Sequence, residues 1–380
     1  MFVASRDLRF ARGRFALMGT VVVLITLLVG LLSGLTAGLA RENTSAVTGL
    51  DADRLAFAAP PDGRAVSFAD SAVEERAWRA WAGRPGVTAA EPLGIRTLDA
   101  AAGDGRRTAA VSAFGVRPDG GLAPGTVAAG RVVLSRQAAD GLGAGAGDTV
   151  RLGGTALTVD AVAGDASYSH TPVVWTSLDD WQGLGGGNTE RGGDGEGGGG
   201  REGGRAGPGA DRATVIALTT HGADLAAGDE AAGTRTLTLD ASLTAIGSYR
   251  AENGSLQLMR GFLFALSALV VGAFFTVWTI QRSADVAVLK ALGASTPYLL
   301  RDALGQAVVM LTAGTGVGTA LAVGVGALVG GGDGAVPFVL DPSTVLLPAA
   351  VMIALGVLGA ALSIRRITAV DPLTALGSVR

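Results

Sequence analysis

The sequence contains no cysteine, a single lysine (Lys290) and two histidines, His170 and His221. Without cysteine the chain can form neither a disulfide nor a thiolate metal site. A Walker-type ATP-binding loop is also excluded, because its G-x-x-x-x-G-K-[ST] motif needs a lysine that follows glycine, whereas Lys290 follows Leu289. We therefore expect no cofactor, no metal site and no ATP hydrolysis by this chain itself.

Charge is missing from four long apolar stretches. A helix rises about 1.5 Å per residue, so about 20 residues cross a hydrocarbon layer about 30 Å thick. Each stretch is long enough, which predicts four membrane passes. Ion-coupled transport is disfavoured, since proton relays and ion sites need ionisable groups inside the membrane. The stretches are 15–40, 261–281, 303–332 and 342–364.

Arginine and lysine flank these stretches on alternate sides, and such residues concentrate on the cytoplasmic side of a membrane. The segments before the first, between the second and third, and after the fourth stretch are basic, whereas the third-to-fourth connection has Asp333 and Asp341 and no basic residue. We expect a multi-pass plasma-membrane protein with both termini cytoplasmic. A cleaved signal peptide is the alternative for the first stretch, but signal cores have only about 7–15 apolar residues.

The predicted fold class is therefore a membrane α-helical protein with four transmembrane helices and an α+β extracytoplasmic domain. The order of segments follows from the apolar stretches and their flanks. The predicted segments are a cytoplasmic amphipathic segment 1–14, helix 15–40, an extracytoplasmic domain 41–257, helix 258–281, a cytoplasmic coupling loop 282–302, helix 303–330, an external loop 331–342, helix 343–364 and a cytoplasmic tail 365–380.

Local patterns predict helices and strands in the extracytoplasmic domain. Ser71 and Glu74 have the spacing of a capping box before a helix that ends near Gly83. Thr149–Leu152 and Thr155–Val162 alternate around a Gly-Gly turn, which predicts a β-hairpin. Residues 183–209 are mostly glycine and predict a flexible insertion. Further strands are expected near Leu55–Ala58, Thr108–Phe114, Val132–Ser135, Val173–Thr176 and Ala213–Leu218.

The loop between the second and third stretches has the pattern of a short helix from about 284 to 292. Val288 and Leu292 share one face, and Gly293 suits the left-handed position that closes a helix. Thr296 then caps the third membrane helix, with Pro297 in its first turn. A capped helix with an apolar face indicates a docking partner, and a plain loop on the lipid headgroups is the alternative.

Small residues recur at every fourth position on three of the membrane helices. They are Gly30, Gly34 and Gly38 on the first, Gly314 and Gly318 on the third, and Gly356 and Ala360 on the fourth. Such rows allow helices to approach closely in lipid. We expect packing within one protomer, with a seam between two copies as the alternative.

Several of these motifs together resemble the FtsX-like (MacB-type) family of ABC permeases. The loop Ala287-Val-Leu-Lys-Ala-Leu-Gly-Ala-Ser295 and the end Arg366-Ile-Thr-Ala-Val-Asp-Pro-Leu-Thr-Ala-Leu376 carry most of the likeness. The runs Gly130-Arg-Val-Val-Leu-Ser and Gly147-Asp-Thr-Val-Arg-Leu resemble the extracytoplasmic domain of that family. The opening Ser5-Arg-Asp-Leu-Arg-Phe is similar to its DevC-like branch.

The resemblance implies a permease that pairs with a second copy of itself or a homologous permease and with a separate ABC ATPase subunit. Membrane lipid and an extracellular adaptor protein are further partners of this class, and no nucleic acid is expected. The segment 284–295 would be the coupling helix. Ser283 and Ala284 depart from the family pattern, which often has an acidic residue directly after the basic one. The residues expected to couple to the ATPase are Asp285, Val286, Val288, Leu289, Lys290, Leu292, Gly293 and Ser295.

Three functions fit these patterns. The first is a permease that exports a lipid-like, peptide or drug substrate by ATP-driven movement of its extracytoplasmic domains. The second is an ATP-driven signal transmitter that regulates an extracellular enzyme of the cell-wall hydrolase type. The third is a membrane-anchored sensor without an ATPase.

Overall fold

The computed structural model describes residues 12–61, 63–184, 211–281, 288, 292–330 and 337–368. The chain divides into two compact units, one made of Met1–Leu39 with Gly254–Arg380 and the other of Ala40–Asn253. Most of the predicted amphipathic segment, most of the glycine-rich insertion and the end of the tail lie outside the described residues, and residues 12–14 belong to the first long helix.

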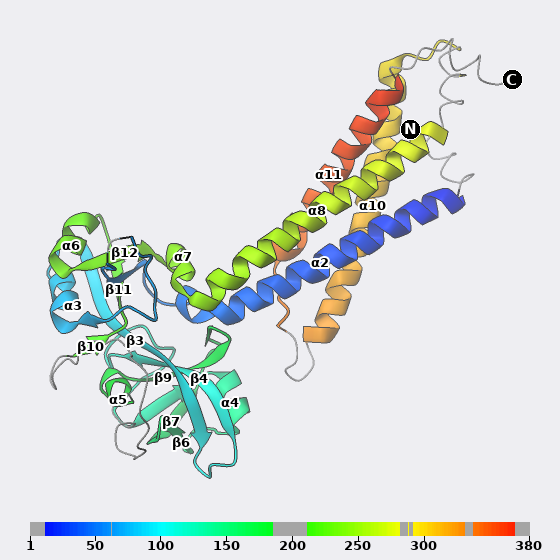
Figure 1. The fold of residues 1–380 in the computed structure, drawn as a ribbon. Coiled ribbons are helices and arrows are strands. Elements are labelled where there is room, and N and C mark those ends of the chain that lie inside the picture. The colour runs from blue at the N-terminus through cyan, green and yellow to red at the C-terminus, as the bar shows by residue number, and fades with distance from the viewer. Residues whose placement is uncertain are drawn as a thin grey trace, which may run out of the picture. The chain divides into compact units, whose positions relative to one another are not determined.

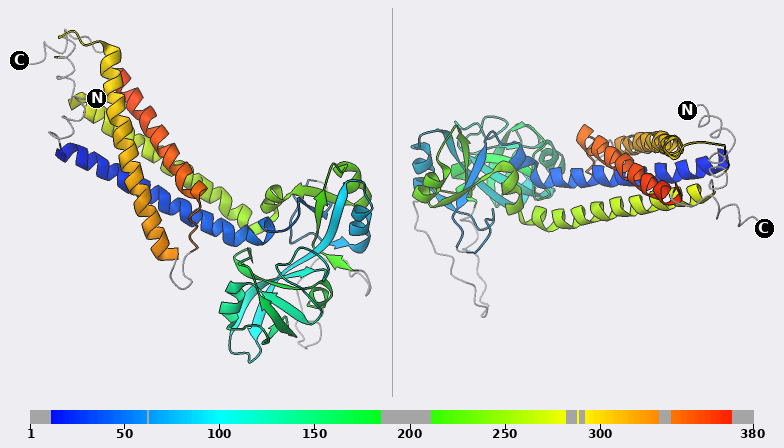
Figure 2. Two further views of the ribbon diagram at one scale, coloured as in Figure 1. Left: turned by 180° about the vertical axis from the view of Figure 1, so that it is seen from behind. Right: turned by 90° about the horizontal axis from the view of Figure 1, so that it is seen from above.

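The first unit consists of long apolar helices (Figure 1). Four described helices have the length and composition to cross a membrane. Their apolar windows match the four stretches that lack charge in the sequence. Figure 2 shows α10 and α11 running side by side from two further directions. The four helices are α2 (Arg12–Thr48), α8 (Gly247–Gln281), α10 (Thr296–Gly330) and α11 (Pro342–Thr368).

All four helices extend beyond the predicted membrane segments. α8 runs unbroken through Gly254 and begins at Gly247, so its first turns belong to the second unit, as does the end of α2. α10 begins at Thr296, which is therefore the first helical residue and not a cap before the helix. The carbonyl of Ser295 accepts hydrogen bonds from the amides of Tyr298 and Leu299 at 3.1 and 3.2 Å.

The second unit is built on a mixed ten-stranded sheet with the strand order β12-β1-β11-β3-β4-β9-β5-β7-β6, to which β8 adds by pairing with β9. β4 pairs with β9, and β5 with β7, in parallel; the other pairs are antiparallel. A separate short pair joins β2 to β10. The strands are β1 (Arg54–Ala58), β2 (Val73–Glu74), β3 (Val87–Ala102), β4 (Thr108–Val116), β5 (Arg131–Leu134), β6 (Thr149–Leu152), β7 (Thr155–Val162), β8 (Ser167–Tyr168), β9 (Thr171–Ser177), β10 (Arg212–Ala213), β11 (Val215–Thr220) and β12 (Thr234–Thr238).

Short helices cover this sheet, and two apolar cores form because alternate side chains of a strand point to opposite faces. In β1, Ala56 belongs to a core with Trp81, whereas Leu55 and Phe57 belong to a core with Phe114. The helices of this unit are α3 (Glu75–Ala82), α4 (Arg136–Leu142), α5 (Leu178–Gly183), α6 (Leu225–Ala232), α7 (Leu239–Ser242) and the 3₁₀ turn η1 (Leu243–Ala245).

The predicted Gly-Gly hairpin is confirmed. β6 and β7 have the predicted bounds, and Leu152 pairs with Thr155 across the turn. Gly153 and Gly154 have φ values of 53° and 93°, the positive values that a two-residue type I′ turn requires. The five further strands expected from the sequence are present as β1, β4, β5, β9 and the pair β10 and β11.

The capping-box prediction is wrong, although the helix it introduced exists. α3 begins at Glu75 after Glu74, whose side chain makes no capping hydrogen bond. Val73 and Glu74 form β2, so this part of the chain is extended. The Ser71 hydroxyl accepts a hydrogen bond from the Ala58 amide at 3.0 Å and donates one to the Thr214 carbonyl at 2.7 Å. Strand contacts have therefore replaced the predicted cap.

The glycine-rich segment leaves and rejoins the domain at one place. The side-chain amide of Gln182, in α5, donates a hydrogen bond to the carbonyl of Arg212, in β10, at 2.9 Å. These two residues stand on either side of the undescribed residues 185–210.

Trp181 packs on two glycines of the central strands. Gly94 of β3 and Gly115 of β4 are cross-strand partners, and a Cβ on either would overlap the Trp181 side chain. The guanidinium carbon of Arg96 lies 5.0 Å from the Trp181 ring centroid, a cation–π distance. The absence of side chains at these two positions therefore allows α5 to pack directly on the sheet.

We predict that Gly94→Ala and Gly115→Ala each lower the free energy of unfolding of this unit by about 1–3 kcal/mol, the usual penalty for overpacking a core. Thermal unfolding of the purified chain measures the change. Gly183→Ala is the control, since Gly183 lies in α5, the helix that carries Trp181, and has no atom within 4 Å of a Cβ placed there. Equal melting temperatures for all three variants would contradict the packing described.

Glu91, in β3, has a carboxylate oxygen buried without a hydrogen-bond partner among the described residues. Burial raises the pKa of this carboxyl above its ordinary value, and the charge of Arg117 and a backbone hydrogen bond from Gly121 oppose the shift. Gly120 lies against the same oxygen, because a Cβ there would overlap it. The ionised form of Glu91 is therefore penalised in the folded chain.

An acid with a raised pKa in the fold contributes full stability below its unfolded pKa and loses it as pH rises through the folded pKa. We predict that Glu91→Gln is more stable than the native chain at pH 7.5, with the difference shrinking toward pH 4. Melting temperatures of both chains across this range provide the measurement. A difference that grows on acidification would show that Arg117 outweighs burial.

Candidate functional site in the membrane-helix unit

The connection between α8 and α10 is described only in part. Asp285, Val286, Leu289 and Lys290 lie outside the described residues. The amide of Leu292 donates to the carbonyl of Val288 at 3.0 Å, the spacing of a helical turn. Val288 and Leu292 are 59% and 80% exposed. Two apolar side chains one turn apart therefore lie open at this end of the unit.

Gly293 follows this turn with a φ of 95°, a positive value that glycine adopts without steric cost. The backbone then reverses and enters α10 after Ser295. These residues have the local geometry expected of a short helix that ends at Gly293.

Glycines of α2 pack against α10 and against the segment before α11, and glycines of α10 pack against α2 and the same segment. A Cβ on Gly30 would lie 2.8 Å from the Cβ of Ala322, and one on Gly318 would lie 2.6 Å from the carbonyl oxygen of Val23 and 2.7 Å from the Cβ of Thr26. Gly314 would approach Val22 to 2.8 Å. Gly30, Gly314 and Gly318 therefore each pack against the other helix within one chain.

The segment 337–341 between α10 and α11 packs into the same surface. A Cβ on Gly34 or on Gly326 would overlap the ring of Phe338, and one on Gly38 would overlap Pro337. The amide of Val339 donates to the carbonyl of Gly34 at 3.2 Å. The ring of Phe338 thus occupies a slot between α2 and α10.

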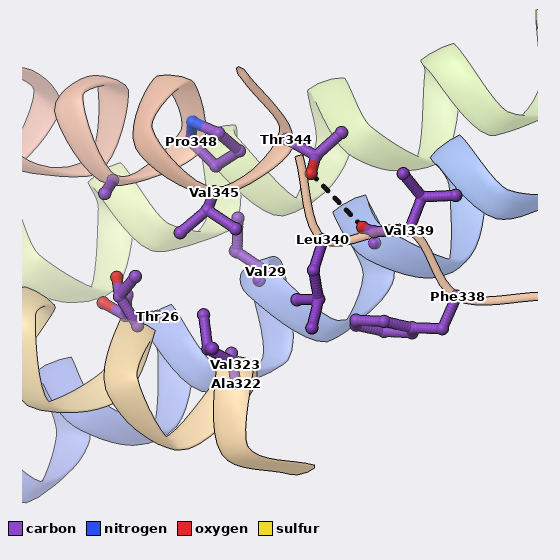
Figure 3. Close-up of a pocket in the computed structure, with 14 residues that line it drawn as sticks. Thr26, Val29, Ala322, Val323, Phe338, Val339, Leu340, Thr344, Val345 and Pro348 are labelled. Atoms are coloured by element: carbon purple, nitrogen blue, oxygen red, sulfur yellow. Dashed lines mark hydrogen bonds between the residues drawn. The ribbon is translucent and has the colours of Figure 1, made fainter. Parts of the chain in front are cut away.

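Figure 3 shows a pocket beside this slot, with Thr26 and Phe338 at its two ends and Val345 between them. The cavity that remains is about 10 Å³, roughly the smallest that holds one water molecule. Thr26 is 3% exposed, and its hydroxyl has no hydrogen-bond partner among the described residues. Sequence reasoning missed Phe338 and Thr26, because nothing in the residues near either one indicates a contact so distant along the chain.

The fold and this unit together define a class of protein: a multi-pass membrane protein with one β-rich extracytoplasmic domain between its first two membrane helices. Two family models match the chain, the MacB-like periplasmic core domain over residues 15–235 and the FtsX-like permease C-terminal region over residues 258–372. The first covers more than half of the chain. The chain belongs to the MacB/FtsX-type family of ABC transporter permeases.

Curated relatives are similar over part of their length. The chain is 40% identical over 135 residues to the "Putative hemin transport system permease protein HrtB" of Staphylococcus haemolyticus, an alignment that covers 35% of this chain and 37% of that protein. It is 28% identical over 145 residues to the protein of the same name from Staphylococcus epidermidis, covering 38% and 41%. The alignments thus span about two-fifths of the length of these relatives.

Two solved structures resemble the chain at low scores. The extracellular domain of the noncanonic ABC-type transporter YknZ from Gram-positive bacteria has a TM-score of 0.33 and 12% identity, covering 50% of this chain and 99% of that one. The periplasmic region of MacB from Actinobacillus actinomycetemcomitans has a TM-score of 0.33 and 9% identity, covering 51% and 92%. The family assignment rests on the two family models.

We predict that Gly318→Leu destabilises the helix packing of α2 and α10 by about 1–3 kcal/mol, because an inserted side chain must displace the α2 backbone. Gly316→Leu is the matched control on the same helix, since no atom lies within 4 Å of a Cβ there. Thermal unfolding of both variants in lipid nanodiscs compares them. Equal stability would show that the two helices do not pack closely at this position.

Proposed function

We propose that this permease is the membrane subunit of an ABC exporter and is driven by an ATPase on a separate chain. Both termini and the α8–α10 connection lie in the cytoplasm in this proposal, and residues 41–257 lie outside. Two copies of the chain, or one copy and a homologous permease, complete the membrane part. ATP-driven closure of the ATPase moves the membrane helices and, through them, the extracytoplasmic domains.

The observation that supports an ATPase partner most directly is the open apolar pair Val288 and Leu292, followed by the turn at Gly293. Exposed apolar side chains on a capped helical turn favour insertion into a groove of another protein. The turn lies within the region that the FtsX-like permease model matches. We assign Asp285, Leu289 and Lys290 to the same coupling surface from their place in the sequence.

Energy must reach the permease from outside the chain. The four charge-free stretches contain no ionisable residue that could bind a coupling ion, and the sequence has no Walker motif. ATP hydrolysis on a partner chain is the remaining source of energy, and it is consistent with the family of ABC permeases.

The substrate we propose is an amphipathic molecule that reaches the permease from the membrane, within the broader class of lipid-like, peptide and drug substrates. The wide apolar surface of the helices supports this class. The curated relatives are named for hemin, a flat apolar ring system that bears carboxylates, and hemin falls within it.

We predict that Leu289→Asp or Gly293→Pro abolishes co-purification of the ATPase while membrane insertion persists. A carboxylate buried without a partner weakens an interface by several kcal/mol, which is about a hundredfold or more in affinity. Gly293→Pro removes the positive φ, because proline is fixed near −65°. Affinity pull-down from membranes that contain both chains measures the loss.

Ala251→Asp is the control, since Ala251 is an exposed residue in the first turns of α8, before the predicted membrane segment 258–281 and far along the chain from the α8–α10 connection. It should retain the ATPase. Full retention by Leu289→Asp would remove the coupling assignment. A signal transmitter would give a different result. The ATPase would stay bound, its turnover would not respond to amphipathic substrates, and its activity would depend on an extracellular protein.

A further inference from the structure

The turn between β8 and β9 has an uncommon backbone. Tyr168 pairs with Thr171, so Ser169 and His170 are the two central residues of the turn. Their φ values are 50° and 63°, and they are the non-glycine residues with positive φ in the described part of the chain. A type I′ turn needs such values at both positions and usually takes Asn-Gly. Residues held in this region cluster where surrounding contacts impose the conformation.

Backbone groups of this turn bond to the end of α2. The amide of Ser169 donates to the carbonyl of Asn43 at 3.0 Å, and the amide of His170 approaches the carbonyl of Glu42 at 3.3 Å. These bonds hold the turn against the last turns of a helix that begins at Arg12.

Side chains of the same turn bond to the start of α8. The Ser169 and Ser248 hydroxyls lie 2.8 Å apart. His170 Nε2 lies 3.0 and 2.9 Å from the two carboxylate oxygens of Glu252. Asn43 joins the two helices, since its amide donates to Glu252 at 3.2 Å and its carbonyl accepts from Ser248 at 2.6 Å. The turn therefore links α2 to α8.

The hairpin that carries this turn is fixed in the domain. The Tyr168 ring lies 5.7 Å from the rings of Phe68 and Phe114 in edge-to-face contact, inside one of the two cores. Ser45 of α2 accepts a hydrogen bond from the Ser167 amide at 2.9 Å and donates to its carbonyl at 3.2 Å. All of these residues belong to the unit Ala40–Asn253, so a displacement of the helix ends acts on the sheet.

The charge of His170 affects this link. Nε2 can bond to the Glu252 carboxylate only when Nε2 carries a proton. It can accept from the Asn43 side-chain amide, 2.9 Å away, only when Nε2 has a free lone pair. One nitrogen cannot serve both at once. Nδ1 lies 3.8 Å from the carboxylate of Glu42. Glu42 from α2 and Glu252 from α8 are the charged groups that contact the ring in the described residues. A doubly protonated imidazole donates to Glu252 and attracts Glu42, while the Asn43 amide gives up its bond to Nε2 and keeps its bond to Glu252.

We propose that the Ser169-His170 turn is a positioning element that locks the ends of α2 and α8 to the β-sheet domain, and that protonation of His170 tightens the lock. The turn transmits movement of the two helices to the domain. Its role in transport rests on the proposed function, whereas the lock itself belongs to this chain alone.

The decisive variant combines Ser169→Asn with His170→Gly. Asn-Gly is the favoured sequence of a type I′ turn, so the hairpin is kept while the side-chain links to α8 are removed. Gly153→Asn is the matched control, because it makes the same Asn-Gly pair in the β6–β7 turn, for which the structure records no bond to either helix.

Hydrogen–deuterium exchange on the full chain in nanodiscs tests the lock without an ATPase. We expect exchange of residues 247–253 to rise about tenfold in the double variant and to remain unchanged in Gly153→Asn. In the native chain, exchange corrected for its intrinsic pH dependence should rise from pH 5.5 to pH 8, because a neutral imidazole cannot interact favourably with both Glu42 and Glu252. His170→Asn should abolish that rise. Unchanged exchange in the double variant overturns the lock. The same pH response in His170→Asn overturns the part of the proposal in which protonation of His170 tightens it.

Transmission is tested with the permease and ATPase assembled together. The chain lacks cysteine, so Asp104→Cys, in the β3–β4 turn, carries a single spin label on each copy. The change in label separation on trapping with ATP and vanadate should fall about fivefold in the double variant, the lower range of coupling between sites. ATP hydrolysis should persist.

The outcomes of the two experiments separate the claims. Faster exchange with an undiminished ATP response refutes transmission through the turn while leaving the lock in place. A native chain that binds no ATPase refutes the proposed function, and the exchange measurement still decides whether the lock exists.

Discussion

Lipid offers no hydrogen bonds to a polypeptide and no hydrophobic force between helices, and this constraint governs the membrane unit. The helices satisfy their own backbone groups, so their association depends on close contact. Glycines 30, 34, 314 and 318 provide that contact by letting side chains and backbone of neighbouring elements approach where a Cβ would collide. The insertion of Phe338 between α2 and α10 follows from the same absence of side chains.

The sequence predicted the membrane helices well, because lack of charge over a fixed length is a strong signal. It also predicted the β6–β7 hairpin, where Gly153 and Gly154 specify the turn. It did not predict β3, a strand from Val87 to Ala102 with many alanines and a proline. That strand forms because β11, β4 and β6 pair with it, and such tertiary pairings leave little trace in local composition. The failure of the Ser71–Glu74 cap has the same origin, since β10 drew Val73 and Glu74 into a strand.

In the functional sites too, locally encoded features could be predicted and features that depend on tertiary contacts could not. The helical turn before Gly293 could be anticipated because capping chemistry is local. The contacts of Phe338 with Gly34, and of His170 with Glu42 and Glu252, join residues far apart in the chain. No periodicity connects those residues, and no neighbouring residue in the sequence indicates a partner for the imidazole of His170. Contacts of this kind become visible only when the sheet and the helix ends are placed in space.

The bond between Gln182 and Arg212 has a consequence for how this domain tolerates change. The described chain stops after Leu184 and resumes at Asp211, close to this bond, so the two ends that must be joined lie near each other. The entropic cost of closing a loop grows slowly, at about 0.6 kcal/mol for each doubling of length. Because the two ends lie close together, a connection of a different length could join them at a small entropic cost, and the site is a natural place to graft a fluorescent protein or an affinity module.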